Sequence, residues 1–284
     1  MSNTNLPFSN TDILDIARKL DDDVIKSARE LLFVPGNIQR LNNYSLVITG
    51  TVGSGKSTIC ESIAYICNTY CPEVNVITYP EFLFVSDSQL SASLLERRLN
   101  GSISINTLQS YILDEWRSLL DMNKDKHGFR IYERCVDDTI ACFCNMANKD
   151  AALSDIQLLS LYERSKEITN EFSVPSYFMA HADRRYSDPG CRFIKIESGA
   201  LCETIINIID IIADDLRNDI DQRIIGLSVT PEVSKYRIRL RSRTGESAYT
   251  DQAIFNFVNH YEKLYSAIES GKRISRFVDL GTLL

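Results

Sequence analysis

The sequence predicts an α/β protein with a doubly wound, five-stranded parallel sheet and helices on both faces. Short apolar segments rich in β-branched residues alternate with longer segments whose apolar residues recur every three or four positions. The first of these strands runs directly into a glycine-rich turn, and an amphipathic helix follows that turn. Strands that alternate with helices pair in parallel, and the connecting helices cover both faces of the sheet.

Each element follows from its own pattern. The predicted strands are residues 44–49, 74–79, 129–132, 176–181 and 235–241. The predicted helices are residues 11–34, divided by an acidic run at 21–23, and then 57–70, 89–99, 106–121, 137–148, 154–171, 199–217 and 250–268. Pro35-Gly36 is expected to end the N-terminal helices. The expected division is a helical arm (1–43), one domain (44–268) and a C-terminal tail (269–284).

Composition excludes several classes of function. The 284 residues include 31 basic and 38 acidic ones, a net charge of −7, which disfavours a general nucleic-acid binder. The sequence has no run of 18 apolar residues and no basic-then-apolar start, so we expect no membrane span and no secretory signal. The eight cysteines form no C-x-x-C pair, which favours free thiols in a reducing, cytoplasmic compartment.

The strongest motif is GTVGSGKS at residues 50–57, which fits G-x-x-x-x-G-K-[ST] between a strand and a helix. Glycines let the backbone turn its N–H groups toward an anion, and the helix adds its positive dipole end. Lys56 can reach the β- and γ-phosphates, and the Ser57 hydroxyl can ligate Mg²⁺. The alternative is a chance glycine turn. The candidate phosphate-binding residues are Gly50, Gly53, Ser54, Gly55, Lys56, Ser57 and Thr58.

Polar residues at other element ends indicate a small-molecule kinase. No N-K-x-D pattern of a GTPase occurs, and no apolar strand ends in the acid of a motor ATPase. Glu81 follows the second predicted strand, where a carboxylate can accept a proton from a hydroxyl. Glu133 and Arg134 follow the third, where an acid suits Mg²⁺ and a guanidinium suits phosphoryl charge. Gln109, on a helix, can both donate to and accept from a nucleobase. The structural alternatives are a surface carboxylate, an ion pair and a solvated helix face.

These motifs, in their order and spacing, resemble the deoxynucleoside kinases, which include the herpesvirus-type thymidine kinases and the cellular deoxycytidine and deoxyguanosine kinases. The resemblance covers residues 44–217 and rests on the phosphate loop, Pro80-Glu81, the segment 106–111 around Gln109, and residues 132–136 around Glu133-Arg134. It implies a P-loop kinase fold with an arginine-containing lid, a homodimer, and transfer of the γ-phosphate of ATP to the 5′-hydroxyl of a deoxynucleoside.

The resemblance also implies residue roles. Glu81 would be the base for the 5′-hydroxyl, and Arg134 would hold the 5′-oxygen and the transferring phosphoryl group. Glu133 and Ser57 would serve the Mg²⁺ site. Gln109 would pair with the base, and Phe143 would lie near it, with a core position as the alternative. The lid candidates, in a stretch that could also be a solvated basic turn, are Arg184, Arg185 and Arg192.

The sequence also departs from the family pattern. Glu81 is followed by Phe82 instead of proline, and no tyrosine lies between Glu81 and Gln109 to hold the 3′-hydroxyl. Cys135 replaces a serine, and the only tryptophan, Trp116, lies on a later helix. This divergence favours a viral member acting in the host cytoplasm. The alternating basic residues of 235–243 predict a solvated edge strand; a contact with the adenine end or a partner is the alternative.

The predicted function is therefore ATP- and Mg²⁺-dependent phosphorylation of thymidine or deoxycytidine in nucleotide salvage for DNA synthesis, with no membrane or nucleic-acid polymer as partner. One alternative is a kinase of nucleoside monophosphates or of another small hydroxyl compound, with Arg97 and Arg98 as further cations. Another is a nucleotide-binding protein that has lost catalysis.

Overall fold

A computed structural model describes residues 19–81, 94, 97–98, 100–177, 181–182, 191–241 and 249–270. Its centre is a parallel sheet with the strand order β2-β3-β1-β6-β5-β4. The strands are β1 (Ser45–Gly50), β2 (Val76–Tyr79), β3 (Phe129–Glu133), β4 (His181–Ala182), β5 (Arg192–Glu197) and β6 (Gln222–Ser228). Five of them have four residues or more, and β4 adds two residues at one edge. The predicted doubly wound parallel sheet is confirmed.

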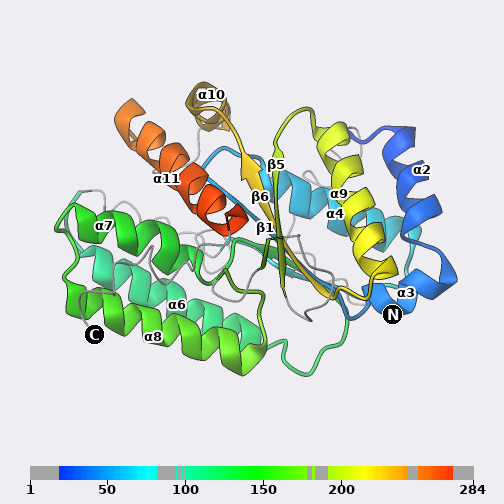
Figure 1. The fold of residues 1–284 in the computed structure, drawn as a ribbon, viewed down its shortest axis with the longest axis horizontal. Helices are drawn as coiled ribbons and strands as arrows, with labels where there is room; N and C mark the ends of the chain where they lie inside the picture. Colours follow the sequence, from blue (N-terminus) through cyan, green and yellow to red (C-terminus); the bar gives the residue numbers. More distant parts are fainter. Residues whose placement is uncertain are drawn as a thin grey trace.

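Helices cover both faces of this sheet (Figure 1). One face carries α2 (Asp22–Leu31), α3 (Pro35–Leu41), α4 (Lys56–Tyr70) and α9 (Leu201–Arg217). The other carries α6 (Ile105–Asp121), the π-helix η2 (Thr139–Cys144), α7 (Asn145–Lys149), α8 (Asp155–Phe172) and α11 (Asp251–Glu269). Neighbouring β1 residues face opposite cores, because Leu46 and Ile48 pack under α4 and α9 while Val47 packs against the second group.

One predicted strand is a helix, and another is only partly described. Residues 235–241 lie in helix α10 (Pro231–Arg241) instead of a strand. Pro231 is the first residue of this helix and Glu232 lies in its first turn, while the Thr230 hydroxyl accepts a hydrogen bond from the N–H of Val233 at 3.4 Å. These are helix-start signals, and they outweigh the alternation of basic and apolar residues. The prediction for 176–181 reaches only His181 of β4, with 178–180 outside the described residues.

Two strands were not predicted at all. β6 lies beside β1, although its Arg223 interrupts the apolar pattern. Arg223 is buried there, and an ion pair with Asp215 of α9 compensates its charge. Asp215 also accepts a hydrogen bond from the hydroxyl of Tyr44. β5 lies beyond β6 and pairs with it from Arg192↔Arg223 to Glu197↔Ser228.

The N-terminal residues that the structure describes pack on the sheet domain. Val24 and Ala28 of α2 are buried in the same core as the α9 residues Ile205 and Ile209. Pro35 begins α3 instead of ending the arm, because its missing N–H is not needed in a first helical turn. The proposed boundaries of arm, domain and tail stay a prediction.

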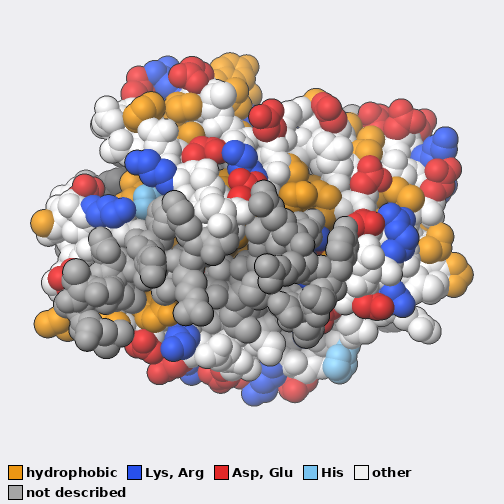
Figure 2. Space-filling model, viewed as in Figure 1, with side chains coloured by type: hydrophobic (Ala, Val, Ile, Leu, Met, Phe, Trp, Pro, Cys, Tyr) orange, Lys and Arg blue, Asp and Glu red, His pale blue; other side chains and the backbone are white. Residues whose placement is uncertain are grey.

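Most of the predicted helices are present with shifts of one or two residues. Hydroxyl caps fix three of the starts, namely Ser104 for α6, Ser154 for α8 and Thr250 for α11. Of the predicted helices 11–34, residues 11–18 lie outside the described residues, and α2 begins at the acidic run 21–23 as expected. The predicted helix 89–99 lies largely outside the described residues. Within those residues, no helix has the length and apolar composition needed to cross a bilayer. Acidic and basic side chains are interspersed on the face shown in Figure 2, and apolar ones gather over α10, where Tyr236 and Leu240 are exposed.

Candidate active site

The phosphate loop, residues 50–57, connects the end of β1 to the start of α4. Gly50, Gly53 and Gly55 all have positive φ in this turn, and the last two show most clearly why it needs glycine. Gly53 has φ +77°, and a Cβ atom there would lie 2.7 Å from the carbonyl oxygen of Ser234 in α10. Gly55 has φ +96° and precedes the first residue of α4. These left-handed conformations place the loop over the N-terminus of α4, where backbone N–H groups and the helix dipole favour an anion.

Several polar side chains of the loop are buried and suited to bind an anion. Lys56 is buried, and its Nζ donates to the carbonyl oxygen of Thr51 at 2.9 Å. The hydroxyl oxygens of Thr51 and Ser54 are buried and have no hydrogen-bond partner among the described residues. Because an unpaired buried hydroxyl is costly, these groups are the kind that a bound polyanion satisfies.

Glu133 brings a buried carboxylate to the loop from the end of β3. The hydroxyl of Ser57 donates to its Oε1 at 2.5 Å, and the backbone N–H of Glu81 donates to its Oε2 at 3.3 Å. Burial and then the charge of Glu81 raise the pKa of Glu133, and the nearby Lys56 ammonium opposes this shift. Paired hard oxygen ligands beside a phosphate loop suit Mg²⁺, and a divalent cation would relieve the crowding of the two carboxylates.

Arg134 is held in one orientation by three hydrogen bonds. Its Nε donates to Oε1 of Glu81 at 2.8 Å, and its Nη1 donates to the carbonyl oxygen of Gly50 at 2.8 Å and to the hydroxyl of Tyr261 at 2.5 Å. The residue itself has φ +78°, which turns the chain sharply after β3. Its Nη2 makes no hydrogen bond to a described residue, so two N–H groups remain for a ligand.

A buried network behind Arg134 fixes that turn. Asp138 accepts from the hydroxyl of Thr49 at 2.8 Å and from the N–H of Cys135 at 3.0 Å. Tyr177 lies within hydrogen-bond distance of both Thr49 and Asp138. The π-helix η2 begins directly after Asp138, and such irregular helices occur often at functional sites.

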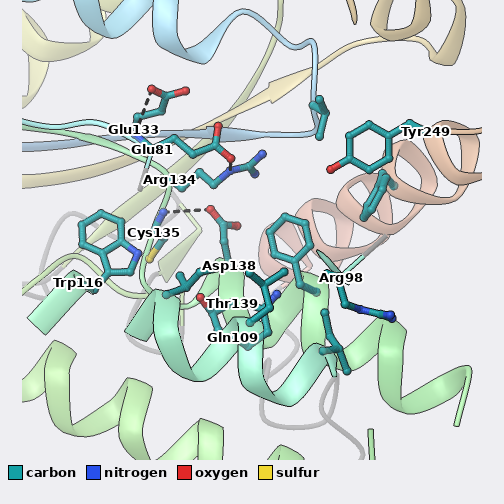
Figure 3. Close-up of a pocket in the computed structure, with 16 residues that line it drawn as sticks. Glu81, Arg98, Gln109, Trp116, Glu133, Arg134, Cys135, Asp138, Thr139 and Tyr249 are labelled. Atoms are coloured by element: carbon teal, nitrogen blue, oxygen red, sulfur yellow. Dashed lines mark hydrogen bonds and ion pairs between the residues drawn. The ribbon is translucent and has the colours of Figure 1, made fainter. Parts of the chain in front are cut away.

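A cavity of about 370 Å³ opens beside Glu81 and Arg134. We call it the Trp116 cavity; its principal lining residues are Glu81, Gln109, Trp116, Arg134, Phe143 and Phe257. Figure 3 shows Glu81 and Arg134 on one side of this space, with Gln109 across from them on α6. Gln109 is only 2% exposed, and its Oε1 has no hydrogen-bond partner among the described residues. The cavity therefore combines apolar walls with an unsatisfied amide, which is typical of a site for a planar polar ring.

Aromatic side chains shape the wall near Arg134. The guanidinium of Arg134 lies 5.3 Å from the ring centroid of Phe143, and Phe143 contacts Phe257 edge-on with centroids 5.9 Å apart. Tyr249, which precedes α11, packs on Phe257 at 5.8 Å. Phe143 is partly buried, packs against the neighbouring core cluster and lines the cavity, and its role near a bound base stays a prediction.

A second cavity, of about 410 Å³, lies along the phosphate loop, and we call it the Arg237 cavity. Gly53, Gly55 and Thr58 line it from the loop and α4. Nη1 of Arg237 donates to the carbonyl oxygen of Ser54 at 3.1 Å and to the hydroxyl of Ser198 at 3.0 Å. A cation from α10 therefore lies against the loop.

The structure brings most of the predicted site residues together. Residues 50–58, Glu81, Gln109, Glu133, Arg134 and Phe143 all lie at the phosphate loop or around the Trp116 cavity. Arg184 and Arg185 lie outside the described residues. The placement of Arg192 in a lid is wrong. It begins β5 opposite Arg223, near the N-terminal end of β6, whereas the loop follows Gly50, which pairs with Leu227 near the C-terminal end of that strand.

Several lining residues were not predicted. Arg237 was assigned to a basic strand, although the helix start at Thr230-Pro231-Glu232 could have placed it on a helix. Trp116, which the sequence places only on a helix, lies on the same face of α6 as Gln109, about two turns further along. Tyr249 and Phe257, which line the Trp116 cavity, and Tyr261, which contacts Arg134, follow no motif. The packing of α11 against η2 brings Phe257 and Tyr261 to the site, and Tyr249 directly precedes α11.

Comparisons with known proteins give only distant similarity. No family model matches the chain, and no curated protein matches it. Among solved structures, deoxyadenosine kinase from M. mycoides with bound dATP superposes with a TM-score of 0.47 at 14% identity, covering 84% of this chain and 97% of that one. The same kinase with the products dCMP and dCDP gives 0.47 at 14%, covering 84% and 96%. Its complex with dCTP gives 0.43 at 14%, again covering 84% and 96%.

Proposed function

We propose that this protein transfers the γ-phosphate of ATP to the 5′-hydroxyl of a deoxynucleoside. The observation that carries the proposal is the pair formed by Glu81 and Arg134. Their side chains meet at 2.8 Å where the Trp116 cavity reaches the phosphate loop. A carboxylate and a guanidinium at that point match the needs of a hydroxyl that must lose a proton while it attacks phosphorus.

Each step of the transfer has a residue suited to it. The loop N–H groups and Lys56 hold the β- and γ-phosphates. Glu81 accepts the proton of the 5′-hydroxyl while the hydroxyl oxygen bonds to the γ-phosphorus. The bond between the γ-phosphorus and the bridging oxygen of the β-phosphate breaks, and ADP leaves. Nη2 of Arg134, which makes no hydrogen bond to a described residue, donates to the transferring group and stabilises its charge. Ser57 and Glu133 would hold Mg²⁺, which neutralises phosphate charge.

The proposed acceptor is a pyrimidine deoxynucleoside, thymidine or deoxycytidine. The unsatisfied Oε1 of Gln109 can accept from a ring N–H or an exocyclic amine, while its amide nitrogen can donate to a ring carbonyl. Trp116 and Phe143 supply apolar and aromatic surface for the flat ring. A homodimer, a viral source, a salvage role and a cytoplasmic location stay predictions.

One observation favours a second candidate, a kinase of nucleoside monophosphates. Arg98 is half-buried in the wall of the Trp116 cavity and has no ion pair with a described residue, whereas Arg97 is exposed. A guanidinium in this wall suits an acceptor that already carries a phosphate.

A single panel tests these functions. Purified protein is incubated with Mg²⁺-ATP and each of the four deoxynucleosides and their monophosphates, and the products are identified by chromatography. We expect a deoxynucleoside monophosphate as product, with Glu81→Gln lowering kcat by about 10²–10⁴-fold while ATP still binds. Glu163→Gln, on the exposed face of α8, is the matched control. Turnover of monophosphates alone favours the second candidate, and ATP binding without any product favours a protein that has lost catalysis.

A further inference from the structure

Tyr261 of α11 is the one side chain outside residues 50–138 that hydrogen-bonds the Arg134 guanidinium among the described residues. Its hydroxyl accepts from Nη1 at 2.5 Å, and the residue is 2% exposed. We propose that Tyr261 is a positioning residue for phosphoryl transfer, holding Arg134 so that its Nη2 faces the transferring group. This inference rests on the proposed function and names a residue that no sequence motif marks.

The geometry leaves Arg134 dependent on Tyr261. The Nε bond to Glu81 and the Nη1 bond to Gly50 fix two of the five N–H groups, and the bond to Tyr261 fixes a third. Glu81 is itself expected to engage the acceptor hydroxyl, so its hold on Arg134 changes during the reaction. The contacts with Gly50 and Tyr261 do not involve the reacting groups, and they keep the guanidinium in place.

The surroundings keep Tyr261 neutral and fixed. Burial raises the pKa of Tyr261 well above its ordinary value, and the adjacent Arg134 only partly opposes this effect. A neutral phenol can accept from a guanidinium without adding a competing charge to the site. Nε2 of the neighbouring His260 lies 2.8 Å from the carbonyl oxygen of Ala141, so α11 is fastened to η2 beside the site.

Tyr265 provides a matched control one turn further along α11. It is also fully buried, and its ring lies 5.8 Å from that of Tyr261. Its hydroxyl, however, has no hydrogen-bond partner among the described residues. Replacing either tyrosine by phenylalanine removes one buried hydroxyl and keeps the ring, but only the change at 261 removes a contact with Arg134.

The experiment compares Tyr261→Phe and Tyr265→Phe with the wild type. We expect Tyr261→Phe to lower kcat by about 10- to 100-fold, the range of one hydrogen bond to a charged group, with KM for ATP and acceptor unchanged within about twofold. Tyr265→Phe should keep the wild-type kcat. Equal kcat values for the two variants, or a loss confined to KM, would overturn the inference. An inactive wild type would instead count against the proposed function.

A binding measurement tests the inference without turnover. Aluminium fluoride added to Mg²⁺-ADP mimics the transferring phosphoryl group, and calorimetry gives its affinity for each variant. We expect Tyr261→Phe to bind this mimic at least tenfold more weakly while ADP alone binds as in the wild type, which also shows that the variant is folded. Unchanged affinity for the mimic would overturn the positioning role, whatever the acceptor proves to be.

Discussion

Arg237 offers a sharp test of the nucleotide site, because no sequence motif marks it and only the fold brings it to the phosphate loop. The side chain comes from α10 and reaches the loop, where Nη1 donates to Ser54 at 3.1 Å. Burial lowers the pKa of Arg237, but a guanidinium remains charged at neutral pH. We expect Arg237→Met to weaken ATP binding and to leave acceptor binding unchanged, because Arg237 lines the Arg237 cavity and not the Trp116 cavity.

The size of the effect follows from the geometry. Two unit charges about 4 Å apart attract by roughly 4 kcal/mol at an effective dielectric constant near 20. Arg237 is only half-buried, so water screens part of this attraction, and the remaining value is about 1.5–3 kcal/mol. That energy corresponds to a loss of roughly 10- to 150-fold in affinity. Methionine keeps most of the packing of the arginine stem, so the loss reports the charge.

Calorimetric titration of Mg²⁺-ATP measures this loss directly, with Arg239→Met as the control. Arg239 is two residues further along the same helix, but its side chain is 69% exposed and it pairs with Asp251 instead of the loop. Removing it should change the dissociation constant by less than twofold. If the two variants bind ATP equally well, Arg237 does not act on the nucleotide and our interpretation of the Arg237 cavity is refuted.

Two further predictions concern the loop and the core. Gly53→Ala should lower both stability and ATP affinity, the latter by about tenfold or more, because its Cβ would lie 2.7 Å from the Ser234 oxygen. Gly101→Ala, with φ +80° but nothing within 4 Å, should cost only the backbone strain of about 1 kcal/mol; equal unfolding energies for the two would contradict this. For Asp137, burial raises the pKa to about 6, so its contribution to stability is present below about pH 4 and is lost as the pH rises through about 6. The unfolding free energy of wild type minus that of Asp137→Asn should therefore fall by about 2 kcal/mol between pH 4 and pH 7, and a difference that stays flat or rises in denaturant titrations would be inconsistent with it.

Local signals were sufficient where one short segment determines both structure and chemistry. The phosphate loop needs its glycines for backbone geometry, so the residues that make the turn also mark the site. Glu81 follows β2 and Glu133 ends β3, and parallel pairing of these strands brings their ends together. For that reason the predicted neighbours Glu81 and Arg134 do meet.

Local sequence patterns did not predict the elements whose structure depends on packing against other parts of the fold. Arg223 and Gly226 break the apolar pattern of β6, yet Asp215 neutralises the arginine and the ring of Tyr265 packs against the glycine. Asp215 is near in sequence, but nothing in the sequence shows that it turns back from α9 to pair with Arg223, and Tyr265 lies far along the chain in α11. The residues 235–241 alternate as a strand would, but a helix satisfies their backbone and places Ile238 in the core with Arg237 at the loop. The sequence likewise does not mark Tyr261 as a site residue, because its contact with Arg134 depends on how α11 packs on the sheet.

The phosphate loop separates two hollows, and adjacent residues face different ones, since Val52 lines the Trp116 cavity while Gly53 lines the Arg237 cavity. If the acceptor binds in the Trp116 cavity and ATP along the Arg237 cavity, neither substrate has to pass through the binding site of the other. We therefore expect the two substrates to add in random order. An inhibitor that joins both substrates would need a polyphosphate linker that crosses the phosphate loop between the two cavities.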